Sequence, residues 1–95
     1  MNILVAFMLV ALPFTPTQCG VIASASETIA LDRDNGVPMG AEKEHWSEGL
    51  LQAGGFTPQM DSFTRSLVQT IYSHPDMTPD DVHTVMLRGC LKISQ

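Results

Sequence analysis

Residues 78–93 of this 95-residue chain, TPDDVHTVMLRGCLKI, carry the most complete helix signal in the sequence. Thr78 is a hydroxyl N-cap, and Pro79 occupies the first helical position, where its missing N–H costs nothing. Two aspartates then place negative charge at the positive end of the helix dipole. Apolar or small residues follow at three- and four-residue spacing and predict one buried face. They are Val82, Val85, Met86, Gly89, Cys90 and Ile93.

Two further helices are predicted upstream of this stretch. Thr57-Pro58 repeats the same opening, and the apolar stripe that follows it must end before Pro75. Residues 41–53 share a face formed by Trp46, Gly49, Leu50 and Ala53, and Gly54-Gly55 ends this segment. The turns are short, so we expect an all-α fold, a small three-helix domain over residues 41–95 built from antiparallel or orthogonal hairpins.

The N-terminal segment has the pattern of a secretory signal. Residues 3–12, ILVAFMLVAL, form an unbroken apolar run. A run of about ten residues suits a signal peptide, whereas a membrane-spanning helix needs about 20. Small residues predict cleavage after Ala25, or alternatively after Ala23, so residues 1–25 are assigned to a signal peptide and the protein to the periplasm or the medium. The alternative is an uncleaved N-terminus that tethers the protein to a membrane.

The segment after the predicted signal is characterised by its charged and turn-forming residues. All ten acidic and all five basic residues lie from Glu27 onward, giving a net charge of −5. An acidic chain with scattered cations lacks the basic clusters that nucleic acids require. Residues 26–40 show no sustained period and contain the turn-forming Asn35-Gly36. We therefore expect a flexible leader arm over 26–40.

One face of the last helix is predicted to bind a partner. His83, Leu87 and Leu91 recur every four residues, away from the predicted buried stripe, unless the first helix or the leader covers them. Because Cys19 falls inside the predicted signal, Cys90 is left as an odd thiol. It is expected either to be buried or to form an intermolecular disulfide.

No pattern in the chain predicts catalysis. The sequence has no Gly-x-Ser-x-Gly elbow and no Gly-rich phosphate loop. We expect no enzyme activity, no cofactor and no metal site, although His45, His74 and His83 with nearby methionines leave a periplasmic metal carrier as a weak alternative. The sequence thus favours an exported, acidic helical protein that binds a macromolecular partner, either another protein or a second copy of itself.

Overall fold

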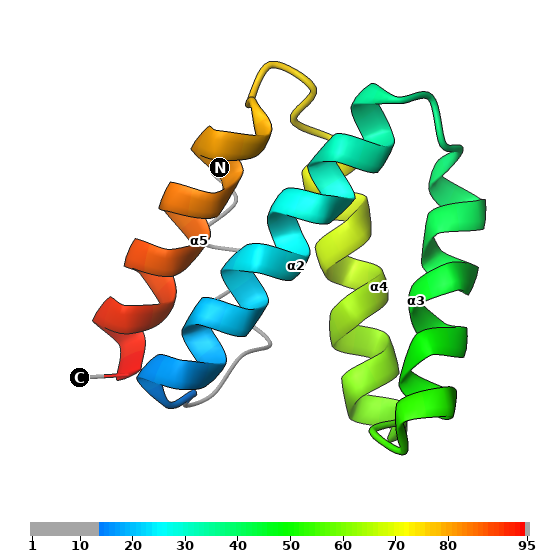
Figure 1. The fold of residues 1–95 in the computed structure, drawn as a ribbon, viewed down its shortest axis with the longest axis horizontal. Helices are drawn as coiled ribbons and strands as arrows, with labels where there is room; N and C mark the ends of the chain where they lie inside the picture. Colours follow the sequence, from blue (N-terminus) through cyan, green and yellow to red (C-terminus); the bar gives the residue numbers. More distant parts are fainter. Residues whose placement is uncertain (1–13, 95) are drawn as a thin grey trace.

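The computed structural model describes residues 14–94, and this part of the chain is entirely helical, with no strand. Figure 1 shows four helices: α2 (Pro16–Asp34), α3 (Met39–Ala53), α4 (Pro58–Tyr72) and α5 (Pro79–Ser94). The all-α prediction is confirmed. The described residues form four helices rather than the three that were predicted, because α2 occupies residues that had been assigned to the signal and the leader.

Helix α2 has a well-defined start. Thr15 is its N-cap, with its hydroxyl accepting from the Gln18 N–H at 3.2 Å while the Gln18 side chain accepts from the Thr15 N–H at 2.9 Å. This reciprocal capping box and Pro16 at the first position fix the beginning of the helix. The predicted cleavage positions, after Ala23 and after Ala25, therefore lie inside a helix.

The expected flexible arm over 26–40 differs from the structure. Residues 26–34 form the second half of α2, and residues 39 and 40 begin α3. Only a short turn separates the two helices, with Gly36 at a φ of 87°. That left-handed conformation is easy for glycine, so the Asn-Gly signal correctly located a turn but not an extended arm.

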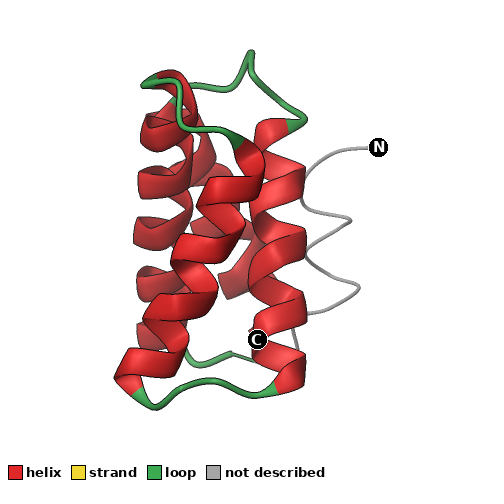
Figure 2. Ribbon diagram, turned by 90° about the vertical axis from the view of Figure 1, so that its right-hand side faces the viewer, coloured by secondary structure: helices red, strands yellow, loops and turns green. Residues whose placement is uncertain are grey.

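The four helices lie roughly alongside one another and are joined by turns at their ends (Figure 2). Helix α2 has its most extensive interface with α5 and also packs on α4, while α3 packs mainly on α4. The core is built from the facing sides of α2, α4 and α5. Its buried apolar residues are Cys19, Ala23, Ile29, Ala30, Phe63, Leu67, Val68, Ile71, Val82, Met86 and Cys90.

A disulfide joins the two helices that share the largest interface. Cys19 of α2 is bonded to Cys90 of α5, their Cα atoms lie 5.5 Å apart, and both residues are buried. The structure therefore pairs Cys90 within the chain, in place of the predicted intermolecular disulfide. Burial of Val82, Met86 and Cys90 agrees with the predicted inward stripe of the last helix.

Arg33 connects the end of α2 to the turn between α4 and α5. Its side chain is 7% exposed. Nη1 donates to the carbonyl oxygens of Ile71 and His74, both at 3.0 Å. Nη2 donates to the Met77 carbonyl at 2.7 Å. A guanidinium at the C-terminal end of α4 adds donors to the carbonyls of the last turn and the loop, and it complements the negative pole of the helix dipole.

Helix α3 is held by polar contacts more than by apolar burial. Its fully buried residues are Glu42 and Ser47, whereas Trp46 and Leu50 are half-buried. The Ser47 hydroxyl donates to Asp61 of α4, and Arg65 of α4 pairs with both Asp61 and Glu44. The apolar face predicted for this helix is thus only partly covered.

Candidate functional site

The predicted partner face on α5 is turned toward the rest of the fold. Leu87 and Leu91 are half-buried and pack against the core. His83 lies across from α2, with Nδ1 2.8 Å from Oε1 of Glu27, an ion-pair distance without the alignment of a hydrogen bond. These three residues are brought together, but they do not form an exposed apolar row. The reason is α2, which covers a helix face that a three-helix domain would have left open.

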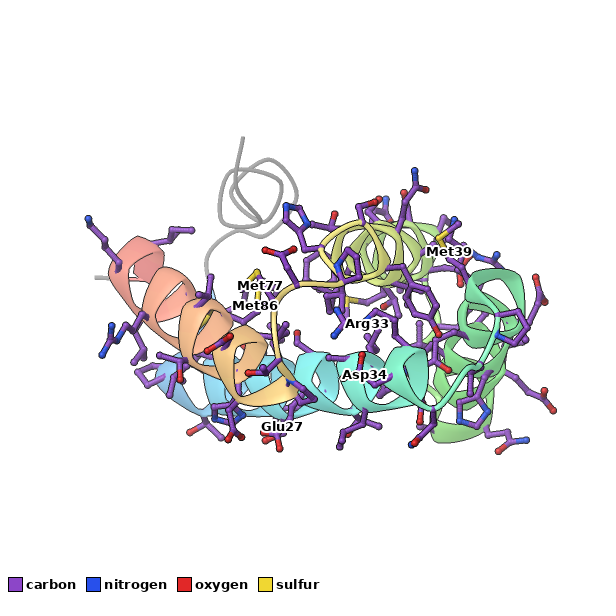
Figure 3. The ribbon with its side chains drawn as sticks, turned by 90° about the horizontal axis from the view of Figure 1, so that it is seen from above. Glu27, Arg33, Asp34, Met39, Met77 and Met86 are labelled. Atoms are coloured by element: carbon purple, nitrogen blue, oxygen red, sulfur yellow. A yellow bond between two sulfur atoms is a disulfide. The ribbon has the colours of Figure 1, made fainter. Side chains whose placement is uncertain are left out.

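The largest exposed apolar side chains of α2 lie on its other side. Val21 is 65% exposed and Leu31 is 46% exposed. Together with Ser24 and Thr28 they follow a helical repeat of three and four residues, and we call these four residues the α2 outer face. Seen from above in Figure 3, α4 lies to one side of α2, and α3 lies beside its C-terminal end. The four residues of the α2 outer face are uncharged, and Glu27 and Asp34, each one turn from Leu31, border it.

A second candidate is a pair of carboxyl groups where α2, α3 and α4 meet. Glu42 of α3 is only 2% exposed, and its Oε2 accepts a hydrogen bond from Trp46 Nε1 at 3.1 Å. Its carboxyl group is also hydrogen-bonded to that of Asp32, at the end of α2. We call Asp32 and Glu42 the acid pair.

The acid pair holds a proton near neutral pH. Burial, followed by the hydrogen bond and the charge of Asp32, raises the pKa of Glu42 to about 7, against a smaller opposing effect of the Trp46 hydrogen bond. The pKa of Tyr72 is also raised, first by burial and then by the charges of Glu42 and Asp32, while its hydroxyl donates to the Val37 carbonyl at 2.7 Å. Because Glu42 is enclosed and already hydrogen-bonded, the pair is placed to hold helices together rather than to exchange a proton with a ligand.

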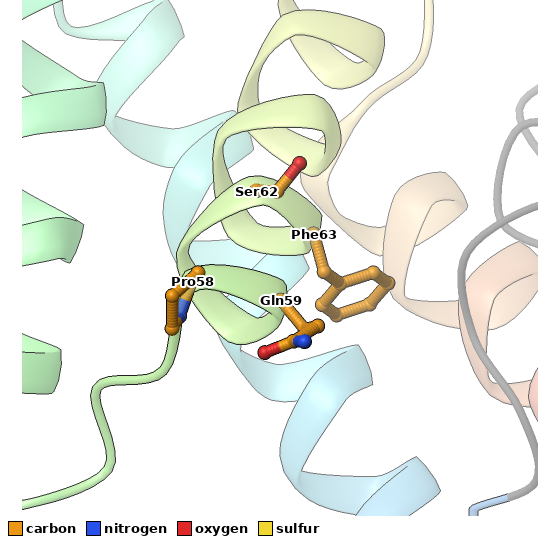
Figure 4. A pocket seen from close by; sticks show the side chains of 4 residues that line it. All are labelled: Pro58, Gln59, Ser62 and Phe63. Atoms are coloured by element: carbon orange, nitrogen blue, oxygen red, sulfur yellow. The ribbon is translucent and has the colours of Figure 1, made fainter.

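Two surface hollows lined by residues that the structure describes carry little chemistry. The larger, of about 370 Å³, is open to solvent and lies beside Pro58, Gln59, Ser62 and Phe63 (Figure 4). Those four residues include a hydroxyl and an amide but no base to activate the hydroxyl. A smaller hollow, of about 180 Å³, lies beside His45, Glu48, Gly49 and Gln52. It has a His and a carboxylate but no hydroxyl or thiol among its lining residues.

The three histidines occupy separate places. His45 is exposed on α3, and His74 Nδ1 lies 2.8 Å from the Thr70 carbonyl oxygen. His83 is the residue already described beside Glu27. Within residues 14–94, no group of three or more His, Cys, Asp or Glu side chains is arranged to hold a metal ion.

The residues that sequence reasoning missed all involve α2. The signal that would have revealed this helix is a third Thr-Pro pair, Thr15-Pro16, which repeats the openings at residues 57–58 and 78–79. The buried residues Cys19, Ala23, Ser26 and Ala30 also follow a helical period. Over the described residues, none of the helices is long and apolar enough to cross a membrane.

In comparisons with known proteins, no family model, no curated protein and no solved structure matches this chain. Its function is therefore inferred from its own residues and their geometry.

Proposed function

We propose that this chain is an exported, disulfide-linked helical protein that acts by binding another protein through the α2 outer face. The observation that carries the proposal is the exposure of Val21 and Leu31 along one side of α2. Apolar side chains aligned on an exposed face are a common feature of binding surfaces. The neighbouring Ser24 and Thr28 are small enough to let a partner helix or loop approach the backbone closely.

Export is supported by two independent features. The apolar run over residues 3–12 has the length of a signal core. The Cys19–Cys90 bond is of a kind that persists in oxidising compartments and is rare where thiols are kept reduced. Both features favour the periplasm or the medium as the place of action.

Binding without catalysis is favoured by the chemistry of the described surface. The hydroxyl in the larger hollow has no base beside it, and the histidine in the smaller hollow has no nucleophile. The most perturbed carboxyl, Glu42, is enclosed. A protein of this kind works through the shape and polarity of a surface.

Site-specific photo-crosslinking in the exporting cell tests the proposal. A photoreactive phenylalanine analogue is placed at Val21 or Leu31, and the tagged chain is purified after irradiation. We expect one discrete protein adduct, the same from both positions, whose mass distinguishes a second copy of this chain from a different protein. The same analogue at Gln52, which is exposed on α3, is the matched control and should give none.

Competition gives a second readout. Leu31→Glu places a charge on the face without removing a buried contact, so the fold should be retained and the adduct from position 21 should be lost. Leu51→Glu makes the same change at another exposed leucine and should leave the adduct intact. Equal adducts from all three labelled positions, or none from positions 21 and 31, would contradict a binding role for this face.

A further inference from the structure

The sequence pattern assigns residues 15–25 to a cleaved signal peptide, whereas the structure places them at the beginning of α2. It matters therefore whether the exported protein keeps them. The small residues Ala23-Ser24-Ala25 resemble a signal peptidase site. In the structure the same residues lie in the first half of α2, where Ala23 is part of the buried core. The consequences of cleavage for the folded protein can be followed residue by residue.

Cleavage after Ala25 would create a new N-terminus at a buried position. Ser26 is 0% exposed, and its hydroxyl donates to the Ile22 carbonyl at 2.7 Å. Cleavage there removes that acceptor and puts an α-ammonium charge at a position closed to water. A charge in such a place is strongly unfavourable unless it is paired, and no acidic residue is among the buried core residues of α2.

Cleavage after either alanine would also remove Cys19. Cys90 of α5 would then have lost its disulfide partner and would face what remains of α2 as a thiol. More than half of the 19 residues of α2 would be lost with a cut after Ala25, including Cys19 and Ala23 from the core. Since α2 and α5 share the most extensive interface, the remaining chain could not bury the inner face of α5.

The contacts at the other end of the segment show where the folded unit begins. Thr15 makes both hydrogen bonds of the capping box with Gln18. The ring of Phe14 lies 5.8 Å from the ring of Phe63 on α4. A chain that begins at or before Thr15 keeps the helix cap, the disulfide and the whole of α2.

We propose that the exported protein retains residues 15–25, and that any removal of the apolar leader takes place N-terminal to Thr15. Ala23 is a core residue of α2 and Ala25 a half-buried residue of the same helix, and neither is the recognition residue of a cleavage site. This inference concerns the maturation of the chain and does not depend on the binding role of the α2 outer face.

The test uses the full chain, with a C-terminal tag, recovered from the exported fraction of the producing cell. Intact mass and N-terminal sequencing should give a first residue at or before Thr15. Digestion without reduction should give a linked pair of peptides containing Cys19 and Cys90, with the summed mass of the two reduced peptides less two hydrogens, and reduction should separate them. A mature N-terminus at Ser24 or Ser26, or free thiols in the exported protein, would overturn the proposal.

A variant gives an independent readout. Ala25→Gln removes the small side chain from the predicted cleavage position at a half-buried helix position, where glutamine is a good helix former. The N-terminus, and the amount of the exported protein, should match the unsubstituted chain, with Ser24→Gln, at an exposed position, as the matched control. A longer form that accumulates only with Ala25→Gln would show that cleavage occurs at this position and would refute the inference.

Discussion

Replacement of Glu42 by glutamine should change how the stability of this protein depends on pH. Glutamine has nearly the same shape, can accept the hydrogen bond from Trp46 Nε1, and can donate to the Asp32 carboxylate. It cannot ionise. The substitution therefore removes the titration of the acid pair while preserving its packing.

The direction and the size of the change in stability with pH follow from the raised pKa of Glu42. The pKa of Glu42 is about 7 in the folded chain and 4.5 as its ordinary value, so between these two pH values the folded state holds a proton that the unfolded state releases. The free energy of unfolding of the unsubstituted protein should then fall as the pH rises through this interval. At about 1.4 kcal/mol per pH unit over this interval, the upper limit is about 3.5 kcal/mol. We expect an observed change of about 1–3 kcal/mol.

The measurement is urea unfolding followed by far-UV circular dichroism, from about pH 4.5 to about pH 8. Glu42→Gln should gain stability relative to the unsubstituted protein by about 1–3 kcal/mol across this range, most of it below about pH 7. Glu48→Gln, at an exposed position on the same helix, is the control and should show no such trend. A constant difference between Glu42→Gln and the unsubstituted protein at every pH would refute the assignment of the proton to the acid pair.

Three further predictions concern the links between helices. The double substitution Cys19→Ala with Cys90→Ala should lower the free energy of unfolding, measured in urea, by about 4 kcal/mol. The reason is that the bond closes a loop across a sequence separation of 71 residues. A loss below about 1 kcal/mol would argue against the pairing. Arg33→Met should destabilise by about 2–4 kcal/mol by removing three hydrogen bonds that a buried guanidinium donates to carbonyl oxygens. Arg88→Met, at an exposed position, should change stability by less than about 0.5 kcal/mol. Native-state hydrogen exchange should be faster in α3 than in α4 and α5, because α3 buries no complete apolar side chain; equal protection in all of these helices would contradict that account.

The sequence predicted the last two helices well because their signals are local. A threonine cap, a following proline and an apolar stripe lie within one segment, and helix α4 begins at Pro58 and α5 at Pro79 as those signals require. The helix at residues 41–53 was also found, but its beginning was placed two residues late and its packing was misjudged. What holds it is a set of polar contacts to α4, and polar contacts between helices leave no periodic pattern in a sequence.

The site was harder to predict, because each of its features depends on a distant residue. Glu42 looked like an ordinary acidic residue in the first turn of a helix. Its raised pKa comes first from burial and then from Asp32, which the turn at Gly36 brings back against it. The position of Leu87 and Leu91 could not be judged without knowing that another helix covers them.

Helix α2 was missed because two different physical requirements select the same residues. A signal peptidase site needs small, uncharged side chains, and so does the side of a helix that packs closely against its neighbours. Ala23 satisfies both requirements, and the absence of charge before Glu27 fits a leader as well as a buried helix. What distinguishes the two is Cys90, 71 residues away from its partner in α2. A cysteine pair joined across that separation places residues 15–25 in the folded protein, whereas the local patterns fit both a leader and a helix.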